Sequence, residues 1–213
     1  MCGAMKLTLY DYYRSSASYR VRIALNLKGA DYERVPVDLL DGEQRDDAYR
    51  ARNPQGFVPM LEAGELRLTQ SLAIIDWLDR RFPEPPLLPA GTDDRAHVVA
   101  LALTIAADIH PLNNLRVILR LKALGHEQEA RDDWYRHWMR EGFAALEALA
   151  APRAGRFLFG DAPTLADVCL VPQMYNARRF ALPLDAWPTL VAADAAASAL
   201  PPFAAAHPDA VAP

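Results

Sequence analysis

A run of hydroxyl side chains near the N-terminus is the first feature of this sequence that could do chemistry. Ser15, Ser16 and Ser18 follow a short apolar segment and stand at the beginning of a helical pattern. The N–H groups and the dipole at a helix N-terminus favour an anion, so a thiol brought there loses its proton more readily. A seryl hydroxyl could donate a hydrogen bond to the resulting thiolate. Serine is also a common N-cap, and capping alone is the simpler interpretation of this run.

Two other junctions could hold the rest of a peptide-like ligand. In the segment Asn53–Pro59, a proline begins a strand after a loop, a position that often has a cis peptide bond. Val58 would then offer its N–H and C=O to an extended peptide, although an ordinary proline-bounded turn explains the same residues. Ser71, which follows Gln70 at the start of a helix, is a good N-cap, and this helix end could also bind a carboxylate. A thiol site, a peptide-backbone site and a carboxylate site are together what glutathione requires.

The elements that must position these residues follow from the hydrophobic pattern of the first 82 residues. Alternating apolar residues predict strands, and apolar residues at helical spacing predict helices. Pro36 indicates that the second strand lies at a sheet edge or starts late, and Gly29 stands where a helix C-cap glycine belongs. The order β-α-β-α-β-β-α predicts a thioredoxin-like layer of four strands and three helices. The predicted ranges are 6–10, 15–28, 32–39, 47–52, 59–63, 65–69 and 71–82.

The composition changes after residue 82, where four prolines within residues 83–89 mark a linker. Beyond it the pattern is helical only. Thr164 to Asp167 resembles a capping box at the start of one helix, and Pro111 interrupts or kinks another. The sequence therefore predicts a thioredoxin-like α/β domain over 5–86 and an all-helical domain over 92–213. The predicted helices are 93–108, 112–124, 127–150, 165–177 and 190–200.

Composition and charge exclude several classes of protein. There are 23 Lys and Arg residues against 27 Asp and Glu, so the net charge of −4 gives no global attraction to nucleic acid or anionic membranes. The two cysteines, Cys2 and Cys169, form no CxxC pair, which argues against zinc ribbons and dithiol redox motifs and favours the cytoplasm. We expect Cys169 to be buried, and no apolar run is long enough to span a bilayer. Met5 could be the natural start, with residues 1–4 either a leader or a non-native addition.

A resemblance to a known family rests on five segments, which are Ser15–Leu25, Asn53-Pro54, Val58-Pro59, Gln70–Ile75 and Leu165–Asp167. These segments resemble zeta-class glutathione transferases, and the resemblance extends from about residue 5 to residue 207. It implies a glutathione-binding thioredoxin-like domain, an all-helical C-terminal domain and a homodimer. The family often has a cysteine after the two serines, where this chain has Ala17. A thiol reaction at that position is therefore excluded, whereas activation by serine is not.

The resemblance also implies roles for individual residues. Ser15 is the hydroxyl expected to activate the glutathione thiol, with Ser16 beside it. Arginines suit the carboxylates of a substrate, and of the adjacent Arg178 and Arg179 the family match favours Arg179. His110 stands where some relatives have glutamine, which would alter substrate contacts. The implied glutathione contacts beyond the two serines are Gln44, Val58, Gln70, Ser71, His110, Asn114, Leu115 and Arg116. The expected substrate contacts are Arg14, which stands beside the thiol site, together with His110 and Arg179, and no metal is expected.

The activity that the resemblance implies is glutathione-dependent cis–trans isomerisation of maleylacetoacetate to fumarylacetoacetate in aromatic amino acid catabolism, by reversible thiolate addition. The substrate would be a small dicarboxylate. Two alternatives within enzymes are maleylpyruvate isomerisation and a general transferase activity on α-haloacids. A third alternative is a non-catalytic interaction module, which would need no thiol site. The presence of Ser15, Val58, Gln70 and Ser71 favours an enzyme.

Overall fold

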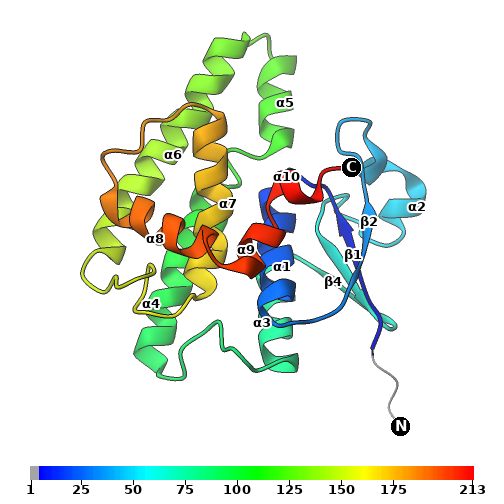
Figure 1. Cartoon of the computed structure of the whole chain (residues 1–213). Helices are drawn as coiled ribbons and strands as arrows, with labels where there is room; N and C mark the ends of the chain where they lie inside the picture. Colours follow the sequence, from blue (N-terminus) through cyan, green and yellow to red (C-terminus); the bar gives the residue numbers. More distant parts are fainter. Residues whose placement is uncertain (1–4) are drawn as a thin grey trace. The chain divides into compact units, whose positions relative to one another are not determined.

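Residues 5–213 are described by a computed structural model (Figure 1). The predictions about Cys2 and the first four residues lie outside the described residues. Two units are present, one that runs to Pro86 and includes Leu200–Pro213, and one that spans Leu87–Ala199. The chain passes from the first unit to the second within the proline-rich linker. The segment Leu200–Pro213 differs from the expectation, because it belongs to the first unit and not to the helical one.

The first unit contains a four-stranded mixed sheet with the order β2-β1-β3-β4. β1 (Leu7–Asp11) pairs in parallel with β2 (Glu33–Pro36) and antiparallel with β3 (Met60–Ala63), which pairs antiparallel with β4 (Leu66–Thr69). This arrangement confirms the predicted thioredoxin-like layer, and β2 lies at the edge that Pro36 indicated.

One helix of the first unit, α1 (Ser16–Leu27), is buried around almost its whole circumference. α3 and α9 both pack against it, which explains why its sequence is apolar on nearly every side (Figure 1). Gly29, just after its end, has a φ of 58°, as the predicted C-cap glycine requires. The other helices of this unit are η1 (Glu43–Arg45), α2 (Asp47–Arg50), α3 (Ser71–Arg81), α9 (Pro201–Ala205) and α10 (Pro208–Val211).

In the second unit, the predicted helix over 93–108 changes type before it ends. α4 (Thr92–Leu103) is followed by the π-helical turn η2 (Thr104–Ile109), where the N–H of His110 donates to the carbonyl of Ile105 at 2.9 Å. Ile109 packs onto α6 so closely that a Cβ at Gly142 would lie 2.2 Å from its Cγ1. The remaining helices of this unit are α5 (Leu115–Ala123), α6 (Gln128–Ala150), α7 (Leu165–Arg179) and α8 (Pro188–Ser198).

The predicted capping box at the start of α7 is confirmed. The buried carboxylate of Asp167 accepts hydrogen bonds from the N–H of Leu158 at 2.8 Å, the N–H of Thr164 at 2.8 Å and the Thr164 hydroxyl at 3.0 Å. Burial raises the pKa of the Asp167 carboxyl, and these hydrogen bonds oppose that shift. Cys169, two residues after Asp167, is fully buried as expected.

None of the helices within residues 5–213 combines the length and the apolar character that crossing a membrane requires.

We predict that Asp167→Ala destabilises the chain by about 3 kcal/mol, because the amides of Leu158 and Thr164 would be left buried without a partner. Urea unfolding measures this loss. The matched control is Asp185→Ala, which removes an exposed carboxylate and should change the unfolding midpoint little. Equal midpoints for the two variants would contradict the role assigned to Asp167.

Candidate active site

The strand register places the three predicted junctions at one edge of the sheet, the one formed by the last residues of β1 and β4 and the first residues of β3. Tyr10 near the end of β1 pairs with Met60 at the start of β3, and Met60 pairs with Thr69 at the end of β4. Ser15 follows β1, Val58 precedes β3 and the start of α3 follows β4. All three junctions therefore leave the sheet at the same edge. This is the geometry that a ligand with a thiol, a peptide backbone and a carboxylate would need.

Ser15 is the N-cap of α1. Its Oγ accepts a hydrogen bond from the N–H of Ser18 at 3.2 Å, and its own N–H donates to the carbonyl of Tyr12 at 2.9 Å. The capping interpretation is thus confirmed, and it leaves the hydroxyl proton of Ser15 able to donate to another group. The side chain of Ser15 is partly exposed, whereas Ser16 is buried. α1 has no acidic residue in its first turn, so no side chain there competes with a bound anion.

The loop before Val58 is fixed from two sides. Asn53 donates from Nδ2 to the carbonyl of Phe57 at 2.7 Å, and the hydroxyl of Tyr49 donates to the same carbonyl at 2.6 Å. Burial raises the pKa of Tyr49 to about 12, so the phenol keeps its proton and remains a donor. The Val58-Pro59 peptide bond is cis.

Gln44 lies in η1, against the loop that precedes Val58. Gly56 in that loop has a φ of 63°, and a Cβ there would lie 2.8 Å from the carbonyl oxygen of Gln44, so only glycine allows this approach. The side chain of Gln44 is buried, and among residues 5–213 its Oε1 has no hydrogen-bond partner. The side chain therefore offers an acceptor that the protein itself does not use.

The start of α3 differs in one detail from the prediction. Gln70, and not the predicted Ser71, occupies the N-cap position, and Ser71 is the first helical residue. Gln70 has a φ of 68°, which costs energy for a residue other than glycine and is often found at functional sites. Its Nε2 donates to Oε1 of Gln55 at 2.8 Å, so the side chain ties the start of α3 to the loop before Val58.

Arg20 in α1 is a candidate site residue that was not predicted from the sequence. It is 2% exposed, and its Nη1 donates to Oγ of Ser71 at 3.4 Å. The guanidinium therefore sets a buried positive charge at the N-terminus of α3, a helix without an acidic residue in its first turn. The signal in the sequence is an arginine on a helix whose other residues are apolar on nearly every side.

Four of the predicted contacts lie together in the second unit, between the end of η2 and the first turn of α5: His110, Asn114, Leu115 and Arg116. Asn114 is the N-cap of α5, and its Oδ1 accepts from the N–H of Arg116 at 3.1 Å. The neighbouring Asn113 was assigned no role from the sequence. It is 5% exposed, and neither polar atom of its side chain has a partner among the described residues.

The arginine pair at the end of α7 divides into two roles. Arg178 forms an ion pair with the buried carboxylate of Asp194. Arg179 is exposed, donates to Oδ1 of Asn176 at 3.3 Å and lies 5.7 Å from the ring of Tyr175. Within residues 5–213 it forms no ion pair with a carboxylate.

Arg14, the other predicted substrate contact, is exposed beside Ser15, with its guanidinium 5.0 Å from the ring centre of Tyr13. No group of three or more His, Cys, Asp or Glu side chains among the described residues is arranged to hold a metal ion.

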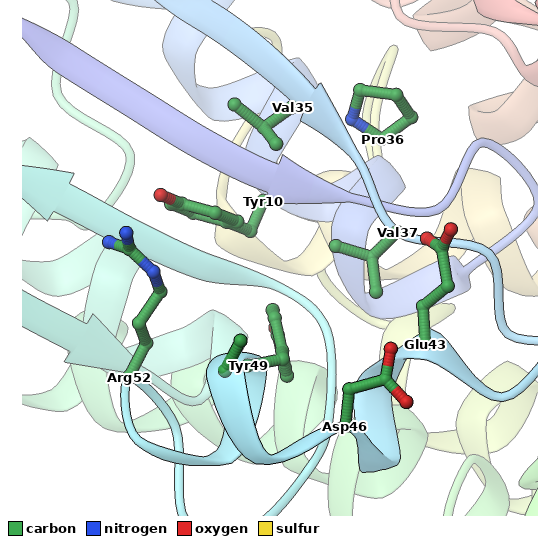
Figure 2. Close-up of a pocket in the computed structure, with 9 residues that line it drawn as sticks. Tyr10, Val35, Pro36, Val37, Glu43, Asp46, Tyr49 and Arg52 are labelled. Carbon is green, nitrogen blue, oxygen red and sulfur yellow. The ribbon is translucent and has the colours of Figure 1, made fainter.

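An open pocket of about 240 Å³ lies on the α2 side of the sheet, between Tyr10 and Tyr49 (Figure 2). The exposed carboxylates of Glu43 and Asp46 lie on one side of it, and Arg52 lies on the other side. The guanidinium of Arg52 is already paired with a carboxylate, that of Glu62, at 2.7 Å. None of the predicted site residues lines this pocket, so it does not contribute to the chemistry described above.

Comparisons with known proteins show the family to which the chain belongs. A family model for the N-terminal domain of glutathione S-transferases matches residues 9–86. The maleylacetoacetate isomerase of Rhizobium meliloti (strain 1021) is 51% identical over 208 residues, which cover 97% of this chain and 98% of that protein.

Solved structures extend the comparison to three dimensions. The holo structure of a maleylpyruvate isomerase, a bacterial glutathione S-transferase of the zeta class, matches with a TM-score of 0.94 at 48% identity, covering 96% of this chain and 98% of that chain. The maleylacetoacetate isomerase of Anaeromyxobacter dehalogenans 2CP-1, with bound dicarboxyethyl glutathione and citrate in its active site, matches with a TM-score of 0.86 at 48% identity. The match covers 98% of this chain and 97% of that chain. The predicted glutathione transferase fold is confirmed, and the chain belongs to the zeta class of the glutathione S-transferase family.

Proposed function

We propose that this chain is a glutathione-dependent isomerase that converts maleylacetoacetate to fumarylacetoacetate. The observation that carries the proposal is the common edge at which Ser15, Val58 and Ser71 leave the sheet, in a chain 51% identical to a maleylacetoacetate isomerase. A non-catalytic module would have no need for this set of residues. When bound, glutathione would supply a thiolate whose reversible addition to one alkene carbon breaks the π bond, so that rotation about the remaining single bond is possible before the thiolate leaves again.

The residues at this edge fit the three parts of glutathione. The main chain of Val58 would pair with the peptide backbone, and the start of α3, with Gln70 and Ser71, would bind a carboxylate. The buried charge of Arg20 would strengthen that carboxylate site through Ser71. The unused Oε1 of Gln44 would accept a hydrogen bond from a ligand N–H.

The hydroxyl of Ser15 is the group that we assign to the thiol. Because its oxygen already accepts from the N–H of Ser18, its proton is directed to another acceptor, and a thiolate at the N-terminus of α1 would receive it. Ser16 lies beside it on the first turn of α1. We assign substrate carboxylates to Arg14 and Arg179, two exposed guanidinium groups.

The class resemblance implies further ligand contacts from the second unit. We therefore assign glutathione contacts to His110, Asn114, Leu115 and Arg116, and we add Asn113 because its buried amide has no partner among the described residues. His110 would contact the substrate as well as glutathione. We further propose, from the class resemblance and the cysteine content, that the protein is a homodimer of the cytoplasm.

Maleylpyruvate is the second candidate substrate. The specific observation in its favour is the TM-score of 0.94 to a maleylpyruvate isomerase, at 48% identity. Both substrates would need the same thiolate and the same arginines, so the residues named above do not distinguish them. A direct comparison of turnover does.

We predict that isomerisation requires glutathione, because no thiol among residues 5–213 is placed at the site: Ala17 follows the two serines and Cys169 is fully buried. Turnover of maleylacetoacetate and of maleylpyruvate, each with and without glutathione, measures this and ranks the two substrates. Full turnover without glutathione would contradict the proposed mechanism. A much larger kcat/KM for maleylpyruvate would replace the proposed substrate with the second candidate.

We predict that Ser15→Ala lowers kcat/KM by about 100-fold, because a donor to the developing charge is lost. The matched change Ser71→Ala removes one ligand contact and should lower kcat/KM by only about fivefold. Steady-state kinetics and the melting temperature are measured for both variants. Equal losses of activity would mean that Ser15 acts only as the helix cap.

We predict that Arg179→Ala raises the KM for maleylacetoacetate by about tenfold, because a charge-assisted hydrogen bond to a carboxylate is lost. The KM for the neutral substrate chlorodinitrobenzene should stay nearly unchanged. Arg178→Ala is the control, since Arg178 is already paired with Asp194 and its loss should affect stability more than either KM. The same KM change for both substrates in Arg179→Ala would exclude Arg179 from the substrate site.

A further inference from the structure

The C-terminal segment Leu200–Pro213 packs against the helix that carries Ser15 at its N-terminus. α9 contacts α1, and Phe203 and Ala206 are fully buried in the first unit. Figure 1 shows α9 and α10, in red, alongside the blue α1. The proposed function assigns nothing to this segment.

Side chains of the thioredoxin-like fold bind the main chain of this segment at its beginning, middle and end. Each bond joins a side-chain nitrogen to a carbonyl oxygen, so these three bonds do not involve the segment's own side chains. The bonds run from Asn26 Nδ2 to Pro202 at 2.9 Å, from Arg22 Nε to Ala206 at 3.0 Å and from Arg34 Nη1 to Val211 at 3.0 Å.

Arg22 also holds the loop that precedes Ser15. Its Nη1 donates to Oδ1 of Asp11, the last residue of β1, at 2.7 Å. Its Nη2 donates to the carbonyl of Tyr13, two residues before Ser15, at 2.9 Å. One guanidinium therefore joins three segments, namely the end of β1, the loop over residues 12–15 and the C-terminal segment at Ala206.

This guanidinium is held in one geometry. The side chains of Arg22 and Asp11 are both fully buried, and Arg34 donates to the other carboxylate oxygen of Asp11 at 2.9 Å. A planar guanidinium with fixed donor directions cannot turn toward one acceptor without leaving another. Without the carbonyl of Ala206, the Nε of Arg22 would be a buried donor without an acceptor. This cost would favour a rearrangement of the Arg22 side chain.

We propose that Arg22 is a positioning residue, and that the docked C-terminal segment forms part of the framework that places the hydroxyl of Ser15. The segment fixes the guanidinium at Ala206, the guanidinium fixes the carbonyl of Tyr13, and this carbonyl sets the path of the chain into Ser15. The effect on glutathione rests on the proposed function, whereas the effect on the loop does not.

The test compares Arg22→Lys with Asn26→Ala and with a chain that ends at Ala199. Lysine keeps a positive charge beside Asp11 but cannot donate in three fixed directions. Asn26→Ala removes one bond to the C-terminal segment and touches neither Asp11 nor Tyr13. Hydrogen exchange is followed in the peptide over residues 12–18 and in the β3–β4 hairpin over 60–69, together with the melting temperature.

We predict roughly tenfold faster exchange over residues 12–18 in Arg22→Lys and in the shortened chain, with exchange over 60–69 unchanged. Asn26→Ala should lower the melting temperature and leave both peptides as in the parent. In Arg22→Lys the pKa of the bound glutathione thiol, followed by thiolate absorbance, should rise and kcat should fall about tenfold.

Unchanged exchange over residues 12–18 in Arg22→Lys would overturn the proposal, as would a change no larger than that in Asn26→Ala. If the shortened chain folds and its exchange over residues 12–18 equals that of the parent, the C-terminal segment does not help to place Ser15. If the shortened chain does not fold, Phe203→Ala takes its place, because it removes the buried ring of α9 and keeps the main chain. A parent chain that binds no glutathione would refute the proposed function, while hydrogen exchange, which needs no ligand, still decides this proposal.

Discussion

The site is organised around the attraction between the dipole of α1 and an anion at the N-terminus of this helix. No acidic side chain in the first turn of α1 offsets this dipole. Ser15 caps this end through its oxygen and keeps its proton for an acceptor outside the helix. The register of β1, β3 and β4 then brings the Val58 loop and the start of α3 to the same edge of the sheet. A shift of one residue in that register would turn every side chain of a strand to the other face, so the site and the sheet are specified together.

Two buried arginines of α1 support this end of the helix in different ways. Arg22 is paired with Asp11 and holds main-chain carbonyls, whereas Arg20 donates to Ser71 at the start of α3. Burying a guanidinium is costly unless it is paired and hydrogen-bonded. Their presence on one buried helix is explained if each fixes a separate part of the site, the thiol end by Arg22 and the carboxylate end by Arg20.

The sequence predicted the elements whose signals are local. Period-two strands, the helix over 15–28 with its glycine cap and the capping box at Thr164 all formed as expected. The features it missed depend on distant residues. α9 and α10 are too short to show a helical period, and the bond from Arg22 to Ala206 spans 184 positions. The π-helical turn over 104–109 packs on Gly142 of another helix, and no local pattern around it records that contact.

A crystal structure of this chain with bound glutathione would show which residues surround the thiol. We predict that the sulfur lies within hydrogen-bond distance of Oγ of Ser15, at the N-terminus of α1, with a carboxylate of the tripeptide at Ser71. A tripeptide bound with its sulfur away from Ser15, or one that does not bind at this edge of the sheet, would contradict it.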